Sequence, residues 1–185
     1  MSPDYKKWTD FLVKLGIDDV AHTQKTYLGH LISVYRFMDS EGCTDEVCRA
    51  GMFHSIYGTE RFQGFKLGLE RRGEVRDLIG SRAEMLAYLN CAMDRGTFDL
   101  AAEGRGETYH FRDRITGEPV DLPRADFDDL CRVHLYDWLE QVSRSSYGWG
   151  YRRAAYRCMA DRLGDKPLAA YERTFATEPK QPLAV

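Results

Sequence analysis

The chain has 185 residues, 43% of them hydrophobic and 12% aromatic, which is enough to bury the core of one ordinary domain. Its 26 basic and 29 acidic residues are mixed along the chain and leave a formal net charge of −3, so no global field attracts nucleic acid or an acidic membrane. No stretch approaches the roughly 18 apolar residues of a membrane span, and the N-terminus lacks the apolar run of a signal peptide, so we expect a cytoplasmic protein. The cysteines form no C-x-x-C pair and are expected to be free thiols: Cys43, Cys48, Cys91, Cys131 and Cys158.

Apolar residues at helical spacing predict three helices in the first third of the chain. The first ends before Gly16, the second covers about 23–39, and the third follows an N-cap at Thr44. His30 lies on the apolar stripe of the second helix, and His54 continues one face of the third. Both histidines are therefore expected to point inward.

In the middle of the chain the spacing of apolar residues changes from helical to alternating. A helical run over 70–79 ends at Gly80, and Ser81-Arg82-Ala83-Glu84 has the pattern of a capping box that opens another helix. Farther on, apolar residues alternate on either side of a turn sequence, which predicts a small β-hairpin near residues 108–122.

Helical spacing returns in the last third of the chain. A long helix over 126–144 places His134 and Asp137 as neighbours on one face. Residues 146–176 predict a C-terminal helical pair. We therefore expect residues 1–185 to form a single all-α, mostly helical domain with the hairpin as an insertion.

His30, His54 and Asp137 follow one another in an order that resembles the HD superfamily of metal-dependent phosphohydrolases, whose pattern is H…HD…D on an all-helical core. The likeness covers roughly 20–142 and implies an HD-like bundle. In that family the aspartate of the HD doublet binds metal directly, whereas Ser55 stands at its position here. A neutral hydroxyl brings no charge, so the standard site is incomplete and the likeness implies a single metal.

A second likeness concerns the segment His54-Ser55-x-Tyr57-Gly58-Thr59. It resembles the signature of a bacterial family without an assigned activity, in which two histidines occupy the stretch His-Thr-Gln-Lys-Thr-Tyr-Leu-Gly-His. Here these are His22 and His30, so the likeness favours a shared site for His22, His30 and His54.

The implied metal ligands are His22, His30, His54 and Asp137, with His134 as another available nitrogen. Imidazoles with one carboxylate suit iron, manganese or zinc better than calcium, so we expect a divalent metal of that group as cofactor. In the alternative interpretation, His30 and His54 are core histidines and Asp137 is one of their hydrogen-bond partners.

The sequence also contains candidates for proton transfer and substrate binding. Glu60 and His134 are candidates for moving protons, although Glu60 is equally well explained as a solvated loop carboxylate. Tyr57 and Thr59 are expected to donate hydrogen bonds to a substrate, and Arg61 to meet a phosphate, although a loop anchor and a solvated helix face also explain them.

The first functional hypothesis is a metal-dependent hydrolase acting on a small phosphorylated or nucleotide-like substrate. The second is an iron-dependent HD-like oxygenase. The third is a degenerate HD-like module that binds a ligand or a protein without catalysis. For the enzyme we expect a small-molecule partner, no nucleic acid and no membrane, and a homodimer is one assembly that the sequence allows.

Overall fold

A computed structural model describes residues 3–18, 20–22 and 24–180, without the side chains of Ala21 and His22. Helices make up 61% of the chain, which confirms the predicted mostly helical class. Within the described residues the α-helices are α1 (Tyr5–Lys14), α2 (Tyr27–Ser40), α3 (Asp45–Met52), α4 (Arg72–Ile79), α5 (Ser81–Ala92), α6 (Arg95–Glu103), α7 (Arg124–Gln141), α8 (Arg153–Leu163) and α9 (Asp165–Phe175). The strands are β1 (Ala21–His22), β2 (Lys25–Thr26), β3 (Thr108–Arg112) and β4 (Pro119–Pro123), and short 3-10 turns occur at η1 (Leu69–Arg71) and η2 (Val142–Arg144).

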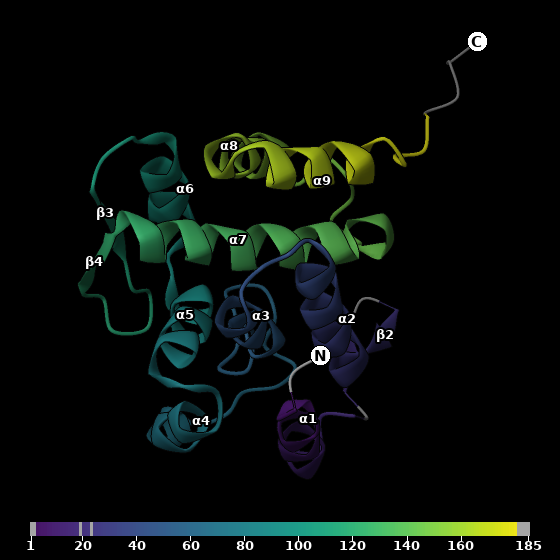
Figure 1. Ribbon diagram of the computed structural model, residues 1–185, viewed down its shortest axis with the longest axis vertical. Helices are drawn as coiled ribbons and strands as arrows, with labels where there is room; N and C mark the ends of the chain where they lie inside the picture. Colours follow the sequence, from purple (N-terminus) through teal and green to yellow (C-terminus); the bar gives the residue numbers. More distant parts are fainter. Residues whose placement is uncertain (1–2, 19, 23, 181–185) are drawn as a thin grey trace.

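Helix α7 runs through the middle of the molecule (Figure 1). It packs against α2, α3 and α5 on one side and against α8 and α9 on the other. More than half of its residues are buried, including the polar His134 and Asp137. Because layers cover α7 on both sides, a polar residue in its middle must find its partners inside the protein.

The N-terminal layer holds the two histidines that the sequence singled out. Helix α2 begins after Thr26, whose side chain accepts a hydrogen bond from the backbone N–H of Gly29, so it starts later than expected. Thr44 caps α3 as predicted, through a bond from the N–H of Val47. His30 lies on α2, whereas α3 ends at Met52 and leaves His54 in the turn that follows.

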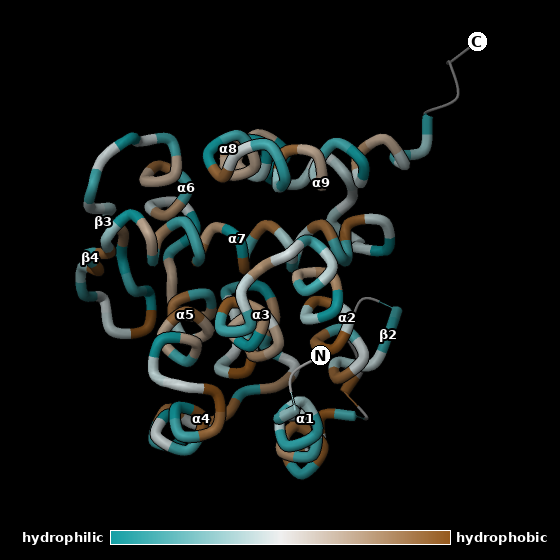
Figure 2. The backbone as a smooth tube through the Cα atoms, in the orientation of Figure 1, coloured by the Kyte–Doolittle hydropathy of each residue, from teal (hydrophilic) through white to brown (hydrophobic). Residues whose placement is uncertain are grey.

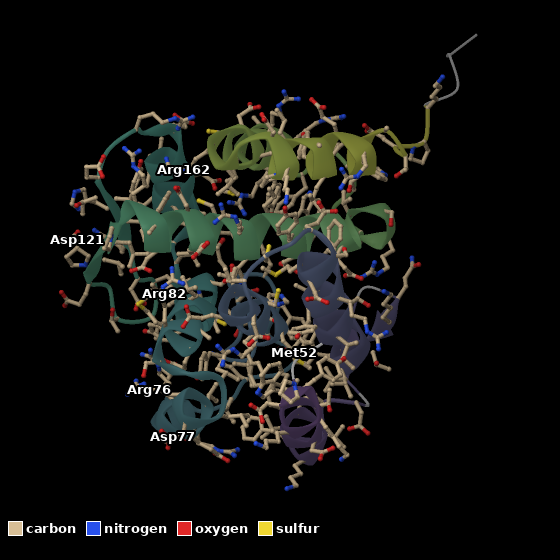
Figure 3. The ribbon with its side chains drawn as sticks, in the orientation of Figure 1. Met52, Arg76, Asp77, Arg82, Asp121 and Arg162 are labelled. Carbon is tan, nitrogen blue, oxygen red and sulfur yellow. The ribbon has the colours of Figure 1, made fainter. Side chains whose placement is uncertain are left out.

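The predicted hairpin is confirmed. Strands β3 and β4 pair antiparallel with Tyr109 opposite Leu122 and Phe111 opposite Val120. The ring of Tyr109 stacks on Phe127 of α7 at 4.4 Å between centroids, which attaches the hairpin to the body. On the outer edge of the hairpin, Asp121 extends away from the helices (Figure 3).

Three features differ from the expectation. The β1–β2 hairpin precedes α2, and α6 lies in a stretch for which the sequence predicted no helix. The predicted capping box is wrong: α5 begins after Gly80, at φ 92°, without a side-chain cap. The Glu84 carboxylate is buried and binds Arg72, which neutralises its charge, and the hydroxyl of Tyr57, which donates a hydrogen bond to it.

The C-terminal helical pair is present as α8 and α9. Hydrophilic and hydrophobic segments alternate along both helices (Figure 2), which is typical of helices with one face on the body and one in solvent. All five cysteines are free, as predicted. Among the helices of the described residues, none has both the length and the apolar character needed to cross a bilayer.

Candidate metal centre

His30, His54 and Asp137 converge inside the protein, from α2, the turn after α3 and α7. The Nε2 atoms of His30 and His54 are 3.4 Å apart. The Oδ1 atom of Asp137 lies 3.1 Å from the first and 3.2 Å from the second. These three atoms therefore form a nearly equilateral triangle between helices that are distant along the chain.

The triangle has the dimensions of one face of a metal coordination sphere. Ligand atoms about 2.1 Å from a tetrahedral zinc ion are about 3.4 Å apart. Adjacent ligands of an octahedral ion at about 2.1 Å are about 3.0 Å apart. The measured separations of 3.1, 3.2 and 3.4 Å lie within this range. Two imidazole nitrogens and one carboxylate oxygen also match the donors preferred by zinc, iron and manganese.

The second nitrogen of each ring is engaged in a way that frees Nε2. The Nδ1–H of His54 donates to the backbone carbonyl of Gly51 at 2.7 Å. The Nδ1–H of His30 donates to Oε2 of Glu140 at 2.8 Å. A proton on Nδ1 leaves the lone pair on Nε2, and such outer contacts are typical of histidines that bind metals. The core-histidine alternative explains the Nδ1 contacts but not the convergence of both Nε2 atoms.

Electrostatics favour a positive charge inside the triangle. Burial acts to raise the pKa of Asp137, but the adjacent His54 and His30, when protonated, outweigh it through their charge and hydrogen bonds, so the pKa lies well below its usual range. Burial acts to lower the pKa of His30, yet hydrogen bonds to Asp137 and Glu140 raise it above its ordinary value. The Asp137 carboxylate therefore attracts either a proton on His30 or a cation held by all three groups.

Hydrogen bonds also hold the carboxylate and the turn of His54 in place. Gln141, one turn after Asp137 on α7, donates to Asp137 Oδ1 at 2.8 Å. Asn90 of α5 donates to the carbonyl oxygen of His54 at 2.8 Å. These supports fix the ligand positions before any ion binds, which lowers the cost of assembling the site.

His134 is buried beside the trio but is not part of it. Its Nδ1–H donates to Oδ1 of Asn90 at 3.1 Å, and its Nε2 accepts from Arg152 at 2.8 Å. Burial and the nearby charge of Arg152 hold its pKa well below the usual value. Since both nitrogens have partners and the ring is neutral, His134 is suited to positioning Asn90. Its predicted part in proton movement stays a prediction.

A cavity of about 200 Å³ opens beside the triangle and reaches His54 and Asp137. Thr59 and Arg61, two of the predicted substrate-binding residues, line it. Tyr57 lies elsewhere, with its hydroxyl on Glu84. The further lining residues are Ser55, Phe62, Arg95, Trp138, Gln141, Tyr147, Tyr151 and Tyr156.

Ser55, expected from the likeness to stand at the position of the HD-doublet aspartate, forms no part of the triangle. Its hydroxyl lies 3.0 Å from the hydroxyl of Tyr27, so the two form a buried hydrogen bond. Among the described residues, His30, His54 and Asp137 are the one group of three or more such side chains close enough to hold an ion. The donor set therefore fits a single metal better than a pair.

The structure does not bring Glu60 into the triangle. Glu60 is exposed, and its Oε2 accepts a hydrogen bond from the backbone N–H of Arg95 at 3.3 Å. The side chain of His22 lies outside the described residues. The sequence analysis missed Glu140, Asn90 and Arg95. The spacing of Asp137 and Glu140, three apart on one helix, was the available signal for Glu140.

Residues 11–95 match the model of a domain of unknown function, DUF6817. The matched segment contains His30 and His54 and ends before Asp137. Comparison with curated proteins and with solved structures finds no match.

Proposed function

We propose that the protein is a hydrolase that depends on a single divalent metal and acts on a small phosphorylated substrate, on a helical fold of the HD-like kind. The observation that carries the proposal is the convergence of His30 Nε2, His54 Nε2 and Asp137 Oδ1 beside an open cavity. A metal held there would acidify a bound water and polarise an ester or phosphoryl oxygen.

The charges around the cavity support an anionic substrate. Arg61 and Arg95 both line it, and the one carboxylate among the lining residues is Asp137. Arg95 donates to the hydroxyl of Tyr151 at 2.7 Å, which aims this part of its guanidinium along the cavity wall. Guanidinium groups bind phosphate oxygens in pairs, so Arg61 and Arg95 are suited to orient a phosphate group.

The other walls are aromatic and support a substrate with a planar or apolar portion. The ring of Tyr147 stacks on Tyr151 at 4.8 Å, and that of Trp138 stacks on Tyr156 at 5.3 Å. The volume of about 200 Å³ is below the roughly 300–1,000 Å³ of sites for drug-sized ligands. This supports a small phosphate ester over a large nucleotide. Glu60, whose carboxylate accepts a hydrogen bond from the backbone N–H of the lining residue Arg95, is the candidate for moving protons.

A second candidate function is an iron-dependent oxygenase. Two histidines and one carboxylate on a single face are the ligand set of many non-haem iron oxygenases, and the triangle described above is such a set. In both cases we propose a small-molecule partner and a cytoplasmic location, where the five free thiols stay reduced.

Metal content after purification without chelators tests the proposal. We expect about one equivalent of metal in the wild-type protein, none in His54→Ala, and full content in His110→Ala. His110 is a matched control because it is an exposed histidine on the hairpin, paired with Asp121 away from the centre. Absence of metal from the wild-type protein would overturn the proposal and leave a binding module without catalysis.

Activity measurements separate the two enzymes. A hydrolase should release inorganic phosphate from members of a panel of small phosphate monoesters, and Arg95→Met should weaken that activity. If the metal is iron, oxygen consumption with candidate substrates and no phosphate release would instead favour the oxygenase.

A further inference from the structure

Glu140 lies at the back of the metal centre, three residues after Asp137 on α7. This spacing places both carboxylates on the same face of the helix. Oε2 of Glu140 accepts a hydrogen bond from Nδ1 of His30 at 2.8 Å, on the side of the ring opposite the ligand atom. The Glu140 side chain is 7% exposed. It contacts the histidine and not the cavity, so its effect on the site must pass through His30.

Two cations contact this buried carboxylate. Nζ of Lys25, on β2, lies 2.9 Å from Oε1 of Glu140, and Arg144 in η2 contacts Oε2. A carboxylate paired with two cations therefore faces Nδ1 of His30.

The two histidines consequently differ in their outer partners. His54 donates to a neutral backbone carbonyl, whereas His30 donates to a charged carboxylate. A carboxylate partner fixes the ring orientation, keeps the proton on Nδ1 and makes the other nitrogen a stronger donor to a metal. An imidazole with a neutral partner gains less of this effect.

We propose that Glu140 is a positioning residue of the metal centre, which holds His30 with its Nε2 lone pair toward the ion and is itself held by Lys25 and Arg144. The inference rests on the metal binding of the proposed function, but on neither of its candidate reactions. It extends the site to β2 and η2, beyond the three ligands.

Zinc affinity of the metal-free protein, measured by competition with a chromophoric chelator, tests this role. Glu140→Gln keeps the size of the side chain and an oxygen that can accept from Nδ1, but removes the charge. We expect it to bind zinc about 10–100-fold more weakly than the wild type. Lys25→Met should weaken binding by a smaller factor, because Arg144 still holds the carboxylate.

Asp128→Asn is the matched control. Asp128 is another carboxylate of α7, and it pairs with Arg162 at 2.6 Å away from the centre. Its substitution should leave zinc affinity unchanged. The ¹⁵N chemical shifts of His30 in the metal-free protein provide a second measurement, because they report which ring nitrogen carries the proton. At a pH where the ring is neutral, we expect the proton on Nδ1 in the wild type and a mixture of both tautomers in Glu140→Ala.

The outcomes distinguish this inference from the proposed function. Zinc binding by the wild type that is unchanged in both Glu140→Gln and Lys25→Met would overturn the role of Glu140 and leave the proposed function standing. No zinc binding by the wild type would overturn both. Should Glu140→Gln fail to fold, Lys25→Met together with the His30 shifts decides the question.

Discussion

Substitution of Gly51 by alanine is expected to destabilise the protein and to weaken metal binding at the proposed centre. Gly51 lies on α3 where this helix packs against α2. A Cβ atom at this position would lie well under 3.0 Å from Sδ of Met38 and 3.4 Å from Cγ1 of Val34. Both neighbours are completely buried, so α3 must move away from α2 or the core must repack.

The size of the effect follows from two opposing contributions. Overpacking a core costs about 1–3 kcal/mol, whereas replacing glycine by alanine within a helix contributes about 1 kcal/mol of stability. We expect a net loss of up to about 2 kcal/mol in the free energy of unfolding, or a fall of up to about 8 °C in Tm for a chain of this length. The carbonyl of Gly51 also accepts the Nδ1–H of His54. A shift of α3 therefore moves His54 relative to His30 and should lower zinc affinity.

Urea unfolding followed by circular dichroism measures the effect. Gly73→Ala is the control, because a Cβ on this exposed residue of α4 meets nothing within 4 Å, so we expect a gain of up to about 1 kcal/mol. In a Met38→Ala background the obstruction is gone, and Gly51→Ala should become neutral or stabilising. Equal stability of Gly51→Ala and Gly73→Ala, with no coupling to Met38, would refute the reasoning.

Three further predictions concern the metal and two carboxylates. Chelation of a metal present at 100 times its Kd should lower Tm by about 5–11 °C, since that loading contributes about 2.7 kcal/mol; a scan with an unchanged midpoint would contradict binding. Glu84→Ala should lower the free energy of unfolding in urea by about 3 kcal/mol, near the lower end for a broken buried ion pair, because Arg72 is partly exposed. A decrease of less than about 1 kcal/mol would contradict a stabilising role of the Arg72–Glu84 pair. Asp94→Ala removes the N-cap of α6 and should cost about 1 kcal/mol at pH 7. Hydrogen bonds from Thr97 lower the pKa of Asp94 in the folded protein. The stabilisation by this cap is therefore fully present above the pKa that Asp94 has in the unfolded chain, and it is lost as the pH falls through the lower pKa of the folded state. The urea unfolding curves of the wild type and Asp94→Ala should consequently converge in acid.

The sequence predicted the parts of the centre that depend on local periodicity. His30 lies on the apolar stripe of one helix, and this stripe correctly predicted that its side chain is buried. Asp137 was singled out by its order after the two histidines and its place on a long helix. Its distance from them depends on how α7 packs against α2 and α3, which no local pattern specifies.

The residues around the trio could not be predicted in the same way. Glu140 reaches His30 across 110 residues of sequence, and Asn90 reaches His54 across 36. The Ser81-to-Glu84 pattern was misleading because a capping box competes with stronger partners. Arg72 and Tyr57 bind the Glu84 carboxylate, and a local rule contains neither.

The origin of the three ligands in different parts of the chain has a consequence for folding kinetics. Helices α2 and α3 follow each other closely, so the two imidazoles can approach through a short-range pairing, whereas the carboxylate arrives only when α7 docks. We therefore expect a cation that needs all three groups to find its full coordination only after α7 has docked. Bound metal then stabilises the folded state but not the folding transition state, so added metal should slow unfolding many-fold and leave the refolding rate almost unchanged.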